Sequence, residues 1–246
     1  SGNFKEAFNY SRKLEKQKLD SFESHLITGI FFLKNSNLDL AKKYFLKAKN
    51  KDSRFVLNNY VSNSLYNWSN LSNLDINSAS LELKKLDKRF ENLKRIQNVF
   101  LHCHYNRPNT NNLFKELTTN NRNADFSRYN YFHASYAFSL GKINEAKNII
   151  QLALKVYPRN LLLNQYKIDL NEAKNINLFN CKKESHVAAE ILYITANALS
   201  SQSIYSLSNF YLNLAKYLNE DFHSYDTLIA ENFYKIDNFK KAKKIY

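Results

Sequence analysis

The chain has 246 residues, which is enough for one large domain or two small ones. Three Gly and two Pro are too few for the many tight turns of a β-sandwich or barrel, and two Cys cannot support a disulfide scaffold. No apolar run reaches the length of about 18 residues that a membrane-spanning helix requires, so the sequence predicts no transmembrane segment.

The formal net charge is +14, from 36 Lys and Arg against 22 Asp and Glu. A basic surface can bind nucleic acid or anionic lipid. However, the chain is also rich in Lys, Asn, Ile, Phe and Tyr and poor in Gly, Pro and Ala, which is the composition that an AT-rich genome produces. We therefore favour composition bias, with many lysines on solvated helix faces, as the explanation of the charge.

A small residue recurs at a fixed spacing along the chain. Ala7 and Ala41 are 34 residues apart, as are Ser208 and Ala242, and Ala146 lies about three periods after Ala41. A period of this length is typical of stacked helix–turn–helix units. The sequence therefore predicts an all-α array of helices, and such arrays present binding surfaces and rarely carry chemistry.

The first residues predict one lone helix and one clear helix pair. Residues 3–18 form an apolar helical face, which we interpret as the second helix of a truncated unit. Residues 21–50 predict a helix, a turn and a second helix, with Ser21 as N-cap and Ser24 as the alternative cap. Within this pair Gly29 and Ala41 are small enough for the two backbones to approach closely.

The middle of the chain repeats this scheme less regularly. Helices are expected over 54–70 and 76–88, and then over 90–106 and 109–120, with Pro108 ending the third of them. Residues 126–158 are the second clear pair, in which Gly141 supplies a left-handed C-cap.

The last part contains an irregular joint and two further pairs. A helix over 161–174 has no obvious partner, and residues 175–185 have weak periodicity and are expected to form a linker. Helix pairs follow over 186–219 and 222–246. The chain opens with turn residues and stops inside a helical pattern, so we expect both ends to be cut.

These residues resemble the tetratricopeptide repeat (TPR). The pattern small–x2–aromatic followed by Ala–x3–aromatic–x2–Ala is present in Gly29, Phe32, Ala41, Phe45 and Ala48, and its phases return in Ala134, Ala146, Ala153 and Pro158. The resemblance implies a right-handed superhelical array of antiparallel helix pairs, a TPR-like α-solenoid. Its repeats would cover residues 1–174, with 54–120 degenerate, and continue over 186–246 after the linker at 175–185.

Residues 186–246 are also similar to the C-terminal part of a group of alphaproteobacterial TPR-containing proteins. Those proteins tend to carry a secretory signal and have no assigned activity. The resemblance implies a bacterial protein of the periplasm or cell envelope, with the cytoplasm as the alternative location.

The resemblance also implies a binding groove, because the first helix of each TPR pair lines the concave face. Tyrosines with polar neighbours suit recognition of an extended peptide. We therefore predict an interaction scaffold or adaptor that holds a peptide or protein partner, with RNA or anionic-surface binding through the basic face as the alternative. The predicted groove residues are Glu23, Leu26, Ile30, Arg128, Tyr131, Ser135, Phe138, Glu190, Tyr193 and Asn197.

The chain has no pattern that predicts catalysis, a cofactor or a metal site. His102, Cys103 and His104 are adjacent, and neighbouring helical residues point about 100° apart, so the three side chains cannot converge on one ion. We expect Cys103 to be a small packed residue. Cys181 is expected to be a surface thiol beside Lys182, without a function. The sequence therefore predicts a protein that is not an enzyme.

Overall fold

The computed structural model describes residues 3–51, 55–119, 126–172 and 178–245. Regular structure within these ranges is helical throughout, without a strand, which confirms the all-α prediction. None of the helices described there is both long and apolar enough to cross a membrane. The chain divides into two compact units: unit 1 is Ser1–Glu91 together with Lys183–Tyr246, and unit 2 is Asn92–Lys182.

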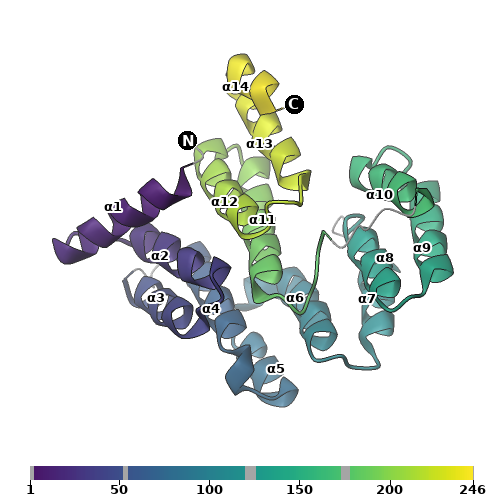
Figure 1. Cartoon of the computed structure of the whole chain (residues 1–246), viewed down its shortest axis with the longest axis horizontal. Helices are drawn as coiled ribbons and strands as arrows, with labels where there is room; N and C mark the ends of the chain where they lie inside the picture. Colours follow the sequence, from purple (N-terminus) through teal and green to yellow (C-terminus); the bar gives the residue numbers. More distant parts are fainter. Residues whose placement is uncertain (1–2, 52–54, 120–125, 173–177, 246) are drawn as a thin grey trace. The chain divides into compact units, whose positions relative to one another are not determined.

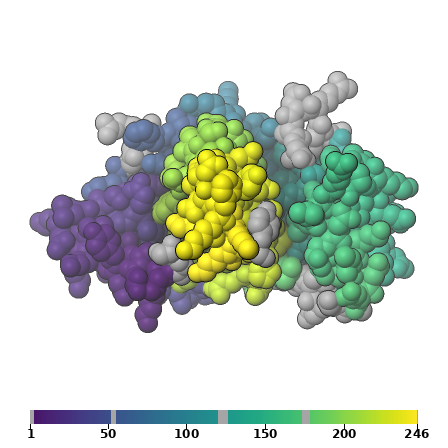
Figure 2. Space-filling model, turned by 90° about the horizontal axis from the view of Figure 1, so that it is seen from above, coloured from purple at the N-terminus to yellow at the C-terminus, as the bar shows by residue number. Residues whose placement is uncertain are grey.

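Unit 1 is built from two separate stretches of sequence (Figure 1). The first contains α1 (Phe4–Lys16), α2 (Phe22–Lys34), α3 (Leu38–Lys51), α4 (Val56–Ser69) and α5 (Ile76–Lys84), with the 3₁₀ helices η1 (Leu71–Asn73) and η2 (Lys88–Phe90) on either side of α5. The second contains α11 (Glu184–Ser201), α12 (Tyr205–Leu218), α13 (Ser224–Lys235) and α14 (Phe239–Ile245). Figure 2 looks onto the end of this unit, where α13 and α14 are yellow.

Unit 2 contains the remaining helices in chain order. They are α6 (Glu91–His104), α7 (Thr110–Thr119), α8 (Tyr129–Ser139), α9 (Ile143–Val156) and α10 (Leu161–Asn171). Of the predicted linker, residues 175–177 lie outside the described residues. Its remaining residues belong to unit 2 up to Lys182, and α11 already begins at Glu184, so this part of the chain is not a simple spacer.

The same tight turn ends the first helix of several pairs. One residue adopts a left-handed conformation, with φ between 51° and 76°, and the amide of the next residue donates to a carbonyl of the last helical turn at 2.9–3.0 Å. This is the Schellman arrangement, which satisfies carbonyls that the helix end leaves open. Gly141 confirms the predicted C-cap, and the equivalent residues elsewhere are Ser36, Asn106, Ser203 and Asp237.

The pair α2–α3 shows why a small residue recurs in the sequence. A Cβ atom placed on Gly29 would lie 2.5 Å from Cε1 of Phe45, which is closer than two carbon atoms can approach. Phe45, Ala41 and Ala48 are completely buried at this crossing. Ser21 is the N-cap of α2, as predicted, whereas Ser24 is not the cap but the third helical residue, which completes a reciprocal capping box with Ser21. The structure therefore confirms the TPR-like packing of this pair.

The return of the chain to unit 1 differs from the predicted domain division. Helix α11 packs against α12 and α13, and also against α4 and α2, from which it is more than 100 residues distant in sequence. Six successive residues, 187–192, are all buried in α11, so this helix is surrounded rather than placed at a surface. Residues 186–246 therefore complete the unit begun by the first 91 residues instead of extending a linear array after residue 174.

A buried polar layer fixes the register of α11, α12 and α13. The Nδ2 atom of Asn232 donates to Ser208 Oγ and to Asn209 Oδ1, each at 2.8 Å. The Oδ1 atom of Asn232 accepts from Ser200 Oγ at 2.6 Å, and Ser208 Oγ donates to the carbonyl of Ala196 at 2.8 Å. Ser208 is thus the small residue of its repeat and a hydrogen-bonding residue at the same time.

We predict that Gly29→Ala destabilises unit 1 despite the better helix propensity of alanine. Alanine should gain about 1 kcal/mol as a helix residue, but overpacking against Phe45 costs about 1–3 kcal/mol, so we expect a net loss of about 1 kcal/mol. Urea unfolding followed by circular dichroism measures this difference. Phe45→Leu makes room for the new methyl group. In a double-mutant cycle, the double variant should therefore lose less stability than the sum of the losses of the two single variants. Full additivity would contradict the close crossing.

Candidate protein-interaction site

The predicted groove residues of α2 are mostly inaccessible. Leu26 and Ile30 are 0% exposed, whereas Glu23 is exposed. Helix α2 is packed against α1, α3 and α4, and also against α11 and α12 from the far end of the sequence. The structure therefore does not leave Leu26 and Ile30 accessible to a partner, because the chain itself covers this face.

The predicted groove residues of α11 are divided in the same way. Glu190 is 0% exposed, and Tyr193 is half-buried with its ring centroid 5.7 Å from that of Tyr225. Only Asn197 is exposed. Glu190 therefore belongs to the interior of unit 1 and cannot contact a partner.

In unit 2, α10 covers part of the predicted groove on α8. The ring of Tyr131 packs edge-on against Tyr166 of α10, with 4.7 Å between the centroids, and both residues are buried. Arg128 and Phe138 are half-buried, and the guanidinium of Arg128 lies 5.4 Å from the ring centroid of Phe132. Ser135 is buried too, but it lines a cavity.

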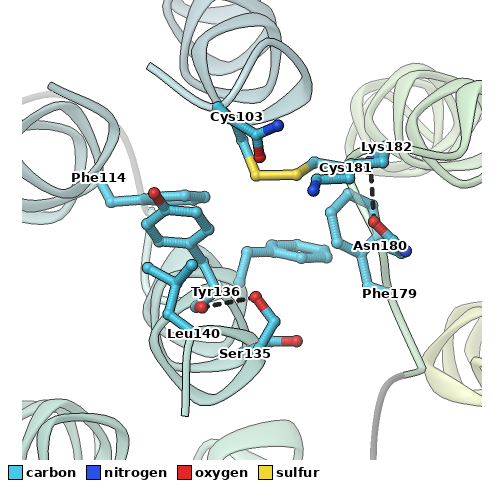
Figure 3. A pocket seen from close by; sticks show the side chains of 12 residues that line it. Cys103, Phe114, Ser135, Tyr136, Leu140, Phe179, Asn180, Cys181 and Lys182 are labelled. Atoms are coloured by element: carbon cyan, nitrogen blue, oxygen red, sulfur yellow. Dashed lines mark hydrogen bonds between the residues drawn. A yellow bond between two sulfur atoms is a disulfide. The ribbon is translucent and has the colours of Figure 1, made fainter. Parts of the chain in front are cut away.

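That cavity lies beside a disulfide and has a volume of about 280 Å³. We call it the disulfide cavity. Figure 3 shows Phe114 and Tyr136 on one side, Phe179 and Asn180 on the other, and the disulfide between α6 and the 178–182 segment at its edge. The remaining wall residues are mainly polar and come from α8 and its C-terminal end, from the turn after α6 and from the 178–182 segment: Asn106, Phe132, Ser135, Ser139, Leu140 and Lys182.

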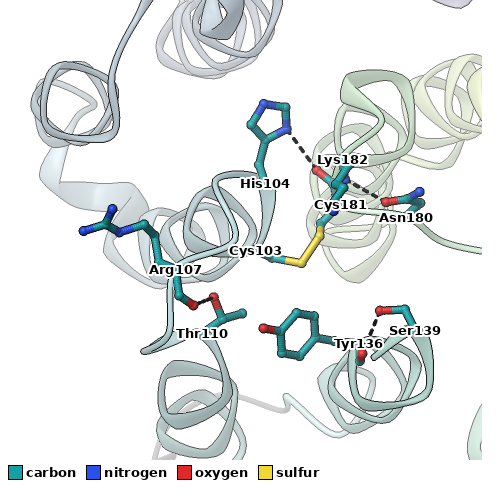
Figure 4. Close-up of a disulfide and its surroundings, with 9 residues drawn as sticks. All are labelled: Cys103, His104, Arg107, Thr110, Tyr136, Ser139, Asn180, Cys181 and Lys182. Carbon is teal, nitrogen blue, oxygen red and sulfur yellow. Dashed lines mark hydrogen bonds between the residues drawn. A yellow bond between two sulfur atoms is a disulfide. The ribbon is translucent and has the colours of Figure 1, made fainter. Parts of the chain in front are cut away.

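The disulfide joins Cys103 of α6 to Cys181, with 6.0 Å between the two Cα atoms. This corrects the prediction that Cys181 is a free surface thiol, since both sulfur atoms are buried and bonded to each other. Figure 4 shows that His104 also approaches this segment, with Nδ1 3.3 Å from the carbonyl oxygen of Cys181. Residues 178–182 are therefore attached to α6 by a covalent and a polar contact.

Phe179 anchors the same segment from inside unit 2. Its ring centroid lies 5.0 Å from that of Phe100 on α6 and 4.5 Å from that of Phe132 on α8, and the residue is only 6% exposed. The contact with Phe132 is edge-to-face and that with Phe100 is tilted, and an edge-to-face contact adds to the gain from burial. The chain thus places one of its own aromatic side chains between two helices of unit 2.

The disulfide contributes strongly to the position of this segment. Ordering five backbone residues costs roughly 5–10 kcal/mol, and burial of one phenylalanine offsets about 1.5–3 kcal/mol of that cost. The bond closes a loop over a sequence separation of 78 residues. On the chain-entropy model, such a loop stabilises the folded state by about 4–5 kcal/mol. The docking of residues 178–182 is therefore coupled to the oxidation state of the two cysteines.

A polar network behind the cavity joins α7, α8 and α9. Nε2 of His133 lies 2.7 Å from Oδ1 of Asn111, and Nδ2 of Asn111 donates to Glu145 at 3.2 Å. The His133 ring stacks on Phe114, a wall residue of the cavity, with 5.4 Å between the centroids. Burial, assisted by the charge of Lys115, lowers the pKa of His133 to about 4, although Glu145 acts in the opposite direction. His133 is therefore neutral at pH 7 and serves packing.

Other chemistry suggested by residue type is not assembled in the described structure. No three His, Cys, Asp or Glu side chains in it are placed to hold a metal ion together. Among the basic residues near 84–95, Lys85 forms an ion pair with Glu82 and Arg89 with Asp87. Part of the positive charge proposed for nucleic-acid binding is thus engaged within the protein.

Sequence reasoning found only one residue of the disulfide cavity, Ser135. The other wall residues come from the end of α6 and the turn after it, from α7, from α8 and its C-terminal end and from a predicted linker, so no single helical pattern contains them. A usable signal was Phe179, which is followed two residues later by Cys181 in an otherwise polar stretch.

No family model matches the chain, and no curated protein matches it in sequence. Among solved structures, it is similar to a chain in the crystal structure of the APC/C hetero-tetramer Cut9–Hcn1, with 16% sequence identity and a TM-score of 0.44. The match covers 96% of this chain and 41% of that chain, so this chain spans about two fifths of its length. The TPR-like assignment here rests on the helix pairs and their small contact residues.

We predict that unit 2 loses stability in acid through His133. Its pKa is about 4 in the folded state and 6.5 in the reference state, so the unfolded chain binds more protons between these values. The stabilisation is fully present above pH 6.5 and is lost as the pH falls toward 4, by roughly 3 kcal/mol. Urea unfolding at pH 7 and pH 4.5 should show a smaller acid loss for His133→Gln than for the wild type.

The comparison between these two chains isolates His133 from three other histidines. Burial also lowers the pKa of His25, His102 and His186, in the last case to about 4, but these residues are present in both chains and cancel in the difference. Identical acid losses for the two chains would contradict the role given to His133.

Proposed function

We propose that this chain is a protein-interaction scaffold that binds a segment of a partner protein at the disulfide cavity. The observation that carries the proposal is a concave site with aromatic walls and a few polar groups, which is the usual form of a specific binding pocket. The site lies on α8, the first helix of a TPR-like pair, and includes the predicted groove residue Ser135.

The size and lining of the cavity favour one side chain of a partner over a large cofactor. A volume of about 280 Å³ is at the lower end for ligand pockets and suits an aromatic ring. Phe114 and Phe132 offer ring faces, while Ser139 and Asn180 offer polar groups. Lys182 is exposed at the same site, so we expect an acidic residue next to the aromatic residue of the partner.

The disulfide also supports a proposal about location. Disulfides form and persist in oxidising compartments such as the bacterial periplasm and are rare in the cytosol. The Cys103–Cys181 bond therefore supports the periplasm or cell envelope, which the sequence resemblance implies, over the cytoplasm.

We predict that Leu140→Arg abolishes partner binding, whereas Leu152→Arg does not. Leu140 lines the cavity and Leu152 lies outside it on α9, yet both are 52% exposed. The two substitutions therefore replace an equally exposed leucine with arginine and differ in whether the position lines the cavity. Peptides are first enriched from a displayed random library on the oxidised wild-type chain. Binding of an enriched peptide to the three chains is then measured by calorimetry, and Leu140→Arg should weaken it by at least about tenfold, or 1.4 kcal/mol.

Salt and the control variant show whether another surface is responsible. Equal loss in Leu140→Arg and Leu152→Arg, or no enriched peptide that depends on Leu140, would contradict the proposed site. RNA binding through the basic surface is the alternative, and it predicts an affinity for oligonucleotides that falls steeply with salt concentration.

A further inference from the structure

We infer that the space between Phe100 and Phe132 is a second part of this interaction site, made for an aromatic side chain of the partner and closed by Phe179 while Cys103 and Cys181 are bonded. The inference rests on the proposed function, because it concerns the same cavity. It assigns residues 178–182 the role of an internal ligand that is released on reduction.

The position of Phe179 is that of a bound ligand rather than of a helix residue. The 178–182 segment is not helical, and its one large aromatic ring enters between α6 and α8 from outside both helices. Both rings that receive it, Phe100 and Phe132, are buried and come from the helical framework. The framework thus forms an aromatic slot, and the segment fills it.

The chemistry of the partner follows from Phe179, the side chain that fills the slot. The slot accepts a phenyl ring carried by non-helical backbone, and the disulfide cavity continues directly from it, since Phe132 and Phe179 line both. Residues 178–182 take their part of the cavity wall with them when they leave, so the slot and the remaining walls on α7 and α8 then form one continuous surface. An extended partner segment with two aromatic residues would cover that surface. With Phe179 in place, only the cavity is open to a partner.

Release requires a defined chemical step. An external dithiol gives two electrons and two protons, the Sγ–Sγ bond breaks, Cys103 and Cys181 become thiols, and the dithiol becomes a disulfide. After that step, no covalent bond holds residue 181 to α6. The site is therefore half-closed in an oxidising compartment and fully open where a dithiol reductant is available.

The rest of unit 2 has contacts that do not involve this segment. The network of His133, Asn111 and Glu145 joins α7, α8 and α9, and Tyr131 packs on Tyr166 between α8 and α10. Reduction should therefore free residues 178–182 without unfolding the helices. A disulfide that gates the site frees only this segment on reduction, whereas a purely structural disulfide would hold the helices as well.

Hydrogen exchange read by mass spectrometry tests the release on the full wild-type chain, with and without a dithiol reductant. We expect amides of residues 178–182 to exchange at least about tenfold faster in the reduced chain, while amides of α7, α8 and α9 keep their protection. Unchanged exchange at 178–182 would overturn the inference. A general loss of protection across unit 2 would overturn it too, because the bond would then hold the fold.

A dye measurement tests the opening of the slot. Anilinonaphthalene sulfonate, an aromatic sulfonate, should bind more tightly to the reduced wild type and to oxidised Phe179→Ala, in which the slot is emptied with the disulfide intact. Reduction of Phe179→Ala should change its affinity for the dye by less than a further twofold, because reduction and the substitution open the same slot. Additive effects of reduction and substitution on dye affinity would overturn the inference. Leu152→Arg should respond to reduction like the wild type.

The two proposals fail in different ways. Exchange and dye binding report the release of Phe179 whether or not a partner peptide is found. If the segment is released but no library peptide depends on Leu140, the proposed function fails and the internal ligand stands. If Leu140-dependent peptides enriched on the reduced chain bind equally to the oxidised and reduced chains, the internal ligand fails and the proposed function stands.

Discussion

The close approach of paired helices is the constraint on which the rest of this structure depends. Two helices can cross with their backbones nearly in contact only where side chains at the crossing are small. Ala41, Ala146 and Ser208 are completely buried at equivalent positions of three pairs, and the clash that a Cβ on Gly29 would make with Phe45 shows how little room remains. Because every pair needs this contact, the same small residue returns at a fixed spacing in the sequence, and the fold is readable from it.

Local features were therefore predictable and distant ones were not. Helix α9 lies inside the predicted pair 126–158 and runs over Ile143–Val156, since its period, its preceding Gly141 and its following Pro158 are all local signals. The packing of α11 on α4 has no such signal, because a buried helix face does not specify which neighbour covers it. This is why Leu26 and Ile30 seemed to belong to an open groove: their apolar face is real, but a distant helix pair occupies it.

The site was harder to predict than the fold for the same reason. The two cysteines allow a single pairing, but they lie 78 residues apart, and spacing alone cannot indicate whether they meet in a chain whose helices can pair in several ways. Within the stretch of weak periodicity, residues 178–183 are non-helical, but a non-helical segment can be docked as firmly as a helix when an aromatic ring and a covalent bond hold it. Polar composition indicates a loop and does not indicate where that loop lies.

A binding surface that holds part of its own chain has a thermodynamic consequence. A partner that needs the slot can bind only the fraction of molecules in which Phe179 is out, so its apparent affinity is its intrinsic affinity multiplied by that fraction. A segment tied to α6 at Cys103 remains at a high local concentration, which keeps the fraction small without any strong noncovalent contact. Breaking one bond changes that concentration and leaves the helices as they were. The regular helix pairs thus supply a rigid frame, and the irregular segment between the two stretches of unit 1 supplies the adjustable element.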